Sequence, residues 1–262
     1  MTILDKIISE KKKEVALQKV RLPLDALSRM KELHRPVLPF PLPGDEAPHI
    51  IAEYKRKSPS RGSFAAAGLP VVEVATAYAS SGAAAVSVLT DTPFFGGSAD
   101  DLLAVRKALP GLPLLRKDFI IDPYQVYESR VMGADIVLLI AAVLSPDEVK
   151  DLSGLAGELG LHVLLELHDE RELDRLCPGI SLVGINNRDL RNFSVDTRKS
   201  AALLEKLPAG VSAVAESGLD SAAAVKELFS AGFSTFLMGE YFLNSEDPGA
   251  RLDGLIKALE HE

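Results

Sequence analysis

Short apolar runs alternate along the chain with longer segments in which apolar and polar positions follow a helical period. Eight runs are rich in β-branched and aliphatic residues, and their starts lie 20 to 36 residues apart: His49–Tyr54, Ala85–Leu89, Leu112–Leu115, Ala134–Ile140, His162–Leu167, Leu182–Ile185, Ser212–Ala215 and Ser234–Met238. An uninterrupted apolar run such as Ile136–Ile140 is typical of a strand covered on both faces, as in a parallel sheet.

The segments between these runs carry signals for the start and the end of helices. Ser145-Pro-Asp-Glu148 offers an N-cap serine, a proline at the first helical position and a glutamate three residues on. The same spacing recurs in Asp169–Glu172. Gly133 and Gly232 stand where a helix ends before the next strand, which favours a left-handed residue. Asp220–Phe229 has the composition and period of an amphipathic helix.

Alternating strands and helices predict a parallel sheet with right-handed crossovers. Eight such units in about 210 residues favour closure into a (β/α)8 TIM barrel of the α/β class. The alternative is an open doubly wound sheet, which usually has a glycine-rich turn after its first strand. The segment Lys55–Gly62 follows the first run here and is basic instead.

The first 48 residues precede the first predicted strand. Leu4–Val15 has the pattern of an amphipathic helix with both charge signs, and Leu24–Leu33 favours a second short helix. Arg35–Pro48 is a proline-rich connector. We therefore expect residues 1–48 to form a helical extension packed on a catalytic barrel of residues 49–262, with a single domain overall.

Composition and charge indicate a globular protein and give no support for a nucleic-acid or membrane partner. The chain has 262 residues, of which 47% are hydrophobic and 25% charged, as in globular proteins. A net charge of −8 gives no support for a nucleic-acid partner. The longest apolar run has nine residues, against the ~20 that span a bilayer, so no membrane partner is expected. The amino terminus carries charge where a secretory signal would have an apolar core.

The single cysteine and the five histidines bear on location and on metal binding. A single cysteine, Cys177, excludes an intramolecular disulfide and favours a reducing, cytoplasmic location. The five histidines show no spacing typical of a metal site, so we predict neither a metal nor a cofactor. The expected assembly is a monomer or a weak homodimer.

Polar residues gather at the ends of the predicted strands, where barrel enzymes place their chemistry. Charged side chains are rarely buried unless they are paired, so this set predicts a shared site at the barrel mouth. The set comprises Glu53, Lys55, Thr90, Asp91, Lys117, Asp118, Glu166, Asn186, Asn187, Arg188, Glu216, Ser217, Gly239 and Glu240. For Asp91, Asp118 and Arg188 the alternative is ion pairs that brace the loops.

The last two predicted loops favour an anion. Ala215–Leu219 and Leu237–Tyr241 each bring glycine to a strand end, where backbone N–H groups can approach a phosphate. Lys55 and Ser58, in the basic loop after the first strand, would complete such a site. The alternative for that loop is a solvated basic segment.

Seven segments together resemble the indole-3-glycerol-phosphate synthase family. They occur in order over nearly the whole chain: Ile51–Gly62, Leu89–Ser98, Leu115–Gln125, Leu165–Asp169, Gly184–Leu190, Ala215–Gly218 and Phe236–Glu240. The opening Ile3–Ile8 is also similar to the amino-terminal helix of that family. The stretches Lys117–Asp122 and Ile185–Arg188 are the most specific part of the resemblance.

The resemblance implies a carboxy-lyase of tryptophan biosynthesis, which closes 1-(2-carboxyphenylamino)-1-deoxyribulose 5-phosphate to indole-3-glycerol phosphate with loss of carbon dioxide and water. Lys117 matches the acid that protonates the ketone, and neighbouring cations would pull its pKa toward neutrality. Glu166 matches the base, with Glu53 and Lys55 as the other candidates for proton transfer. Lys55 would also supply a cation beside the substrate carboxylate. The pair that removes the hydroxyl as water stays open.

Further residues are expected to bind this small-molecule phosphosugar–anthranilate substrate. Phe95, Phe119 and Leu138 match an apolar wall for the anthranilate ring, with plain core packing as an equal alternative. The expected substrate-binding residues are Ser58, Phe95, Phe119, Leu138, Asn186, Arg188 and Glu216. The expected phosphate-binding residues are Lys55, Ser217, Gly218, Gly239 and Glu240. Because a carboxylate repels a phosphate, Glu240 would act through its backbone N–H and point its side chain away.

Two other functions stay open. One is a different phosphosugar barrel, of the phosphoribosylanthranilate isomerase or tryptophan synthase α type, which needs fewer acid–base groups than this chain offers. The other is an inactive barrel that only binds a phosphorylated ligand. Intact Lys117, Glu166 and Glu53 argue against it, because a binding module needs no spaced acids and bases.

Overall fold

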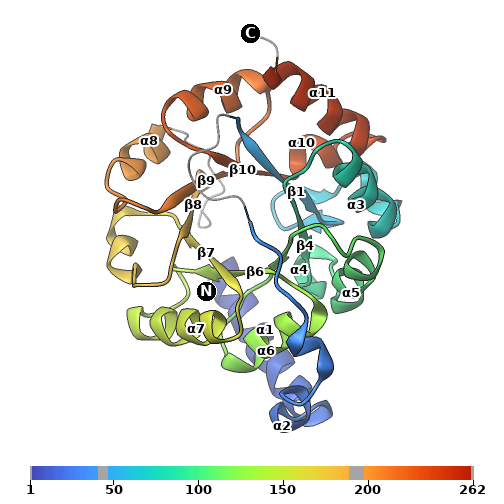
Figure 1. Ribbon diagram of the computed structural model, residues 1–262, viewed down its shortest axis with the longest axis vertical. Helices are drawn as coiled ribbons and strands as arrows, with labels where there is room; N and C mark the ends of the chain where they lie inside the picture. The colour runs from blue at the N-terminus through green and yellow to red at the C-terminus, as the bar shows by residue number, and fades with distance from the viewer. Residues whose placement is uncertain (1, 41–46, 189–197, 261–262) are drawn as a thin grey trace.

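The computed structural model describes residues 2–40, 47–188 and 198–260. Eight parallel strands close into a barrel, and helices surround them (Figure 1). In their order around the barrel the strands are β1 (His49–Tyr54), β4 (Ala85–Leu89), β5 (Leu114–Lys117), β6 (Ile136–Ile140), β7 (His162–Leu167), β8 (Leu182–Asn186), β9 (Ser212–Glu216) and β10 (Thr235–Met238). The predicted TIM barrel is confirmed. Part of the expected connector (41–46) and of the family motif (Asp189 and Leu190) lies outside the described residues.

Each of the eight predicted runs contains a strand, and three strands continue further than the apolar pattern does. β5 ends at Lys117, β8 at Asn186 and β9 at Glu216. These polar residues remain in register with the neighbouring strand, Lys117 opposite Leu89 and Asn186 opposite Glu216. The parallel ladder therefore extends into the polar layer at the barrel mouth, where hydrophobicity no longer marks a strand.

The helices follow their predicted signals with one exception. Ser145 and Glu148 form a capping box at the start of α7 (Pro146–Glu158), and Gly133 ends α6 (Pro123–Met132) with a φ of 90°. Asp169 begins a 3-10 helix, η3 (Glu170–Arg175), in place of an α-helix. There Glu172 bonds the backbone N–H of His168 instead of closing a capping box with Asp169.

The remaining elements complete the outer layer and the loop after β1. The helices are α3 (Val71–Ser80), α4 (Thr92–Phe95), α5 (Ala99–Ala108), α6 (Pro123–Met132), α7 (Pro146–Glu158), α8 (Arg198–Leu204), α9 (Ala222–Ser230), α10 (Glu240–Leu243) and α11 (Pro248–Glu260), with a 3-10 turn η2 (Ala65–Gly68). The loop after β1 forms a two-stranded hairpin of β2 (Lys57–Ser58) and β3 (Gly62–Ser63).

The amino-terminal segment contributes to the core of the barrel. Helix α1 (Ile3–Arg21) is longer than expected, and the second helix is split into α2 (Leu24–Leu27) and the 3-10 helix η1 (Lys31–His34). In Figure 1, α1 lies behind the ring of strands beside α6, which it contacts. Ile7 of α1 belongs to the apolar cluster that fills the inside of the barrel. The division into an extension of 1–48 and a barrel of 49–262 stays a prediction.

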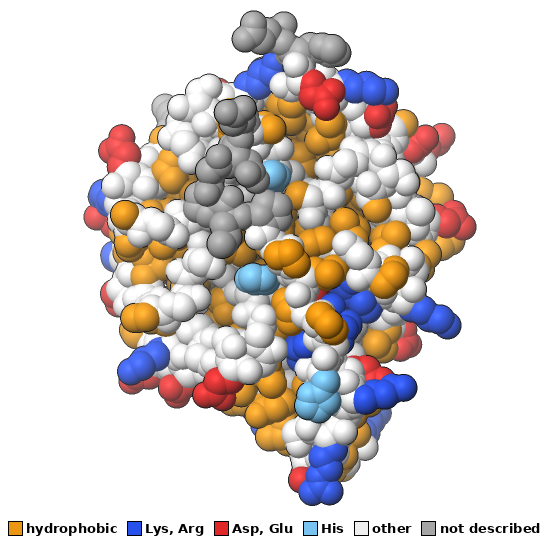
Figure 2. Space-filling view, in the orientation of Figure 1, with side chains coloured by type: hydrophobic (Ala, Val, Ile, Leu, Met, Phe, Trp, Pro, Cys, Tyr) orange, Lys and Arg blue, Asp and Glu red, His pale blue; other side chains and the backbone are white. Residues whose placement is uncertain are grey.

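The face shown in Figure 2 carries side chains of both charge signs around its outline and mostly uncharged side chains at its centre. Across the described residues, no helix combines the length and apolar character needed to cross a membrane.

Candidate active site

Strand alternation decides which side chains face the inside of the barrel. In β7, Leu164 packs in the interior cluster, whereas Leu165 packs beneath the surrounding helices. Two residues after Leu164, Glu166 keeps the inward direction at the carboxyl end of the strand. The same step leads from Leu115 to Lys117 on β5. Side chains that are distant in sequence are thereby brought to one layer.

A cavity of about 580 Å³ opens above this layer, within the range of small-molecule sites. The fifteen residues given a catalytic or binding role from the sequence all line it: Glu53, Lys55, Ser58, Phe95, Lys117, Phe119, Leu138, Glu166, Asn186, Arg188, Glu216, Ser217, Gly218, Gly239 and Glu240. They come from all eight strands and the loops that follow them. Of the other polar residues expected at the barrel mouth, Asp118 lines the cavity as well, whereas Thr90, Asp91 and Asn187 are not among its lining residues.

Lys117 lies at the centre of a cluster of carboxylates. Its Nζ is 2.9 Å from Oε2 of Glu166 and 3.4 Å from Oε2 of Glu216, and its side chain is 14% exposed. Burial alone would lower the pKa of the Lys117 ammonium. The charges of Glu166, Glu216 and Glu53 outweigh burial and raise that pKa above its ordinary value.

The expectation that cations would pull the pKa of Lys117 toward neutrality is thus wrong. The closest charged neighbours in the described structure are acids from β7 and β9, not the basic loop after β1. Lys117 is therefore protonated at neutral pH, as an acid must be before it donates a proton.

The two carboxylates beside Lys117 differ in their proton affinity. Burial raises the pKa of Glu166, but Lys117 and His168 overcome it and lower that pKa below its ordinary value. For Glu216, burial and the charges of Glu166 and Glu53 prevail over Lys117 and raise the pKa. The site thus holds one carboxylate that stays ionised and one that binds a proton readily. Such a separation is typical of paired acid and base groups.

A second ion pair lies on the β1 side of the cavity. Nζ of Lys55 is 2.6 Å from Oε1 of Glu53 and also faces the Phe64 ring, 5.4 Å from its centroid. Gly239, at the end of β10, leaves room for this carboxylate, because a Cβ there would lie 2.7 Å from Glu53 Oε1. The close approach of β10 to Glu53 explains the glycine at this strand end.

The turn after β9 adopts a conformation that favours ligand contact. Ser217 has a φ of 65°, in the left-handed region that non-glycine residues rarely adopt, and Gly218 follows with 74°. Asn187 holds this turn, since its Nδ2 donates to the carbonyl oxygens of Ser217 at 2.9 Å and Glu216 at 3.1 Å. Strained backbone of this kind is concentrated at functional sites.

Glu240 ties three loops together through its side chain. Its carboxylate accepts from Arg188 Nη2 at 3.1 Å and lies 3.1 Å from Nε of Arg61. The loops after β1, β8 and β10 therefore meet at this carboxylate. Two arginines engage the side chain, as expected for a carboxylate that is not itself an anion ligand.

The apolar side of the cavity combines barrel loops with the amino-terminal helix. The rings of Phe95 and Phe119 lie 6.0 Å apart between centroids. Ile3, Leu4 and Ile7 of α1 line the same cavity. An aromatic pair beside aliphatic side chains is suited to a flat ring.

Comparison with known proteins decides the family. A model of the indole-3-glycerol phosphate synthase family matches residues 4–255. A protein of that name from Bacteroides thetaiotaomicron is 41% identical over 98% of this chain and 99% of its own length. Another from Polaromonas sp. is 47% identical over 95% and 96%, respectively. The chain belongs to the indole-3-glycerol phosphate synthase family. The resemblance seen in the sequence motifs is confirmed.

Two solved structures of low sequence identity resemble this member of the indole-3-glycerol phosphate synthase family in fold. A 3-hexulose-6-phosphate synthase aligns with a TM-score of 0.64 at 17% identity, over 80% of this chain and 99% of that one. A tryptophan synthase α subunit from Legionella pneumophila aligns with a TM-score of 0.59 at 14% identity, over 82% and 94%. Both likenesses support the barrel fold and carry no information about the reaction.

Two polar residues of this synthase-family site, His168 and Asn187, were given no catalytic or binding role from the sequence. Nε2 of His168 lies 3.2 Å from Oε1 of Glu166, although the sequence placed His168 only at a helix entrance. Its position two residues after Glu166, on the same side of an extended segment, is a signal that could have found it. Asn187 was noted at a strand end but given no role. Among the described residues, no group of three or more potential metal ligands comes together.

Proposed function

We propose that this chain closes 1-(2-carboxyphenylamino)-1-deoxyribulose 5-phosphate to indole-3-glycerol phosphate, with loss of carbon dioxide and water. The observation that carries the proposal is the Lys117 ammonium, held 2.9 Å from Glu166 at the base of a 580 Å³ cavity. The family match over residues 4–255 supports the same reaction.

Lys117 acts as the general acid in this proposal. Attack of the aromatic ring carbon on the ketone places negative charge on the carbonyl oxygen, which must receive a proton. The raised pKa of Lys117 keeps the ammonium charged when substrate binds. Fixed close to its carboxylate partners, the same cation also stabilises the developing oxyanion without reorganisation.

Loss of carbon dioxide restores the aromatic ring, and Lys55 supplies the cation beside the departing carboxylate. Glu166 then acts as the base that removes a proton as the hydroxyl leaves as water, because its lowered pKa keeps it ionised. Lys117 and the Lys55–Glu53 pair are both candidates for the acid of this last step. The 2.6 Å contact between Lys55 and Glu53 supports proton exchange within that pair.

Binding is divided between the two sides of the cavity. Phe95, Phe119 and Leu138 contact the anthranilate ring, and Asn186, Glu216, Ser58 and Arg188 orient the sugar and the charged side chains. Backbone groups of Ser217, Gly218, Gly239 and Glu240, together with Lys55, hold the phosphate. The left-handed turn at Ser217–Gly218 supports this assignment, because it exposes backbone next to the strand end.

The test is a fluorescence assay of indole formation from the carboxyphenylamino-deoxyribulose phosphate, with purified protein and no added metal or cofactor. Turnover is the expected result. Binding of the substrate without turnover would favour a barrel that only binds phosphorylated ligands. Neither binding nor turnover would overturn the substrate assignment, and phosphoribosylanthranilate would then be the next substrate to assay.

The cellular setting is part of the same proposal. We infer a cytoplasmic enzyme with small-molecule partners, acting as a monomer or weak homodimer without nucleic acid or membrane. The half-buried thiol of Cys177, 3.3 Å from Ser153 Oγ, supports a reducing compartment. Light scattering over a range of protein concentrations measures the oligomeric state.

A further inference from the structure

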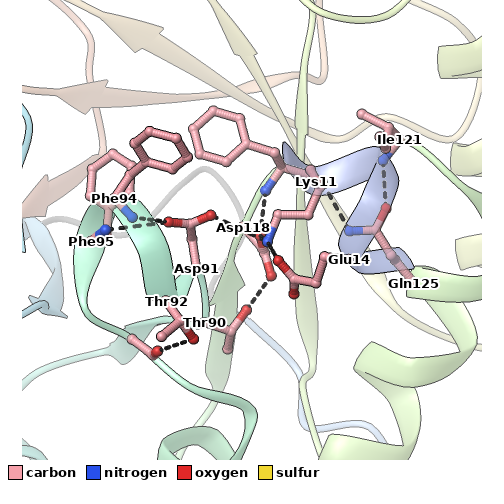
Figure 3. A network of polar contacts seen from close by, with 12 residues as sticks. Lys11, Glu14, Thr90, Asp91, Thr92, Phe94, Phe95, Asp118, Ile121 and Gln125 are labelled. Carbon is pink, nitrogen blue, oxygen red and sulfur yellow. Dashed lines mark hydrogen bonds and ion pairs between the residues drawn. The ribbon is translucent and has the colours of Figure 1, made fainter. Parts of the chain in front are cut away.

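Lys11 is a buried cation that belongs to the amino-terminal helix and not to the barrel. Its side chain is 1% exposed, while Lys13 on the same helix is 69% exposed. Nζ of Lys11 lies 2.9 Å from Asp118 Oδ1, 2.8 Å from Glu14 Oε2 and 3.3 Å from Asp91 Oδ2 (Figure 3). A lysine is rarely buried this deeply unless its charge is paired.

The two barrel partners of Lys11 lie in the loops after β4 and β5. Asp91 caps α4, where its Oδ1 accepts from the backbone N–H groups of Phe94 at 2.9 Å and Phe95 at 3.3 Å. Asp118 Oδ1 accepts from the backbone N–H of Phe119 at 2.8 Å. One ammonium thus joins Asp91, which holds the backbone of Phe95 (Figure 3), to Asp118, which holds the backbone of Phe119.

The same helix face that carries Lys11 also lines the cavity. Ile7 precedes Lys11 by four residues, and Leu4 precedes it by seven, so the three side chains lie along one face of α1. Both apolar residues line the pocket beside Phe95 and Phe119. The position of the ammonium therefore fixes how far α1 reaches over the aromatic pair.

We propose that Lys11 is a positioning residue for the aromatic side of the active site, which it sets by clamping the loops after β4 and β5 to α1. The proposal rests on the proposed function, since it assigns the aryl part of the substrate to this side. Lys11 itself contacts no reacting atom.

The two clamped loops depend on Lys11 to different degrees. Asp118 has two further partners besides Lys11, Thr90 Oγ1 at 2.5 Å and Arg116 Nη2 at 3.0 Å. Within the described part of the chain, Asp91 has no cation other than Lys11 within 4 Å. Removal of the ammonium should therefore displace Asp91 and α4, and with them Phe95, more than Phe119.

The experiment compares Lys11→Met with Lys13→Met, the same substitution at an exposed position of the same helix. Anthranilate is the probe for the aromatic side, and its own fluorescence can be followed because the chain has no tryptophan. Inorganic phosphate is the probe for the opposite side. In Lys11→Met we expect the Kd of anthranilate and the KM of the substrate to rise about 3- to 30-fold. The Kd of phosphate and kcat should stay near the values of the unmodified protein.

Two further variants separate positioning from folding. Lys11→Arg keeps the charge and should retain most of the anthranilate affinity. Lys11→Met/Asp91→Asn removes the unpaired carboxylate while an amide oxygen still caps α4, so it should recover part of the affinity lost in Lys11→Met. If Lys11→Met does not fold, as judged by circular dichroism, these two variants decide the question.

The outcomes distinguish this proposal from the proposed function. Equal weakening of anthranilate and phosphate, or no change in either, would show that Lys11 only stabilises the fold. Anthranilate binding that responds to Lys11 while the unmodified protein turns over no substrate would keep the positioning role and reject the reaction. An unmodified protein that binds phosphate but no anthranilate would overturn the positioning role.

Discussion

Two buried lysines, Lys11 and Lys117, are each surrounded by carboxylates, yet their surroundings differ in one respect. The acids around Lys11 are occupied by backbone N–H groups, as Asp91 and Asp118 show. Around Lys117, Oε1 of Glu216 has no hydrogen-bond partner among the described residues. The Lys117 cluster also faces the cavity, whereas the Lys11 side chain is 1% exposed. The position of the lysine at the cavity, and not the density of charge around it, therefore distinguishes the Lys117 cluster from the Lys11 cluster.

Strand alternation produces this difference on neighbouring residues. On β5, Lys117 faces the barrel interior, while Arg116 faces outward and contacts Asp118 and Glu128. Neighbouring residues of one strand thus differ in their surroundings: Lys117 lines the cavity, whereas Arg116 is held in an ion-pair network.

The largest expected effect is on turnover, in Lys117→Met. Removal of the acid should lower kcat by at least ~10²-fold, the usual scale for a positioned acid or base, while substrate binding is retained. Steady-state indole formation and substrate titration measure the two quantities. The matched variant Lys11→Met should keep most of kcat. Equal losses of kcat in both variants would remove the distinction between the two clusters.

A smaller loss of turnover is expected in Gly184→Ala, which acts only on the Lys117 cluster. A Cβ at Gly184 would lie 2.0 Å from Oε1 of Glu216, so this buried carboxylate must shift and its geometry with Lys117 must change. A displacement of about 1 Å in an active site costs up to about 10²-fold in rate. The control is Gly154→Ala, because Gly154 lies in helix α7 with no atom within 4 Å of the new Cβ. Unchanged kcat in Gly184→Ala would mean that the position of Glu216 does not matter for the reaction.

The Lys11 cluster, by contrast, is expected to affect the free energy of unfolding. Burial raises the pKa of Asp118, but Arg116 and Lys11 prevail and lower it to about 2. Because this value lies below the unfolded value of about 3.9, the stabilisation is present above pH 4 and lost as pH falls toward 2. Asp118→Asn should lower the free energy of unfolding by about 2 kcal/mol at pH 7. Urea unfolding at pH 7, 4 and 3 measures it, and a deficit that did not shrink below pH 4 would contradict the assignment.

The sequence could predict the barrel and the members of the site because both follow from local patterns. Apolar runs mark the strands, and a parallel barrel brings all their carboxyl ends to one face. Glu53, Lys117, Glu166 and Glu216 could be selected in this way without knowledge of their contacts. Their mutual distances could not, because they depend on closure of strands that are distant along the chain.

The role of Lys11, by contrast, could not be predicted from the sequence. It stands in a run of three lysines, Lys11 to Lys13, and nothing in the residue type separates it from its neighbours. The helical period offers a signal, since Ile7, Lys11 and Val15 are spaced by four and all three are buried. That signal becomes informative only when the acids that face α1 are known, and these come from β4 and β5.

The smallest expected effect concerns His168, which lies at the edge of the Lys117 cluster. The imidazole of His168, with Nε2 3.2 Å from Glu166 Oε1, helps to lower the pKa of that carboxylate. His168→Asn should therefore raise the pKa of Glu166 and move the acid limb of the pH profile of kcat to higher pH by a fraction of a unit. His162→Asn, at the amino end of the same strand, is the control. An acid limb that stays in place would mean that Lys117 alone keeps Glu166 ionised, unlike Asp118 in the Lys11 cluster, which has both Lys11 and Arg116 as cationic partners.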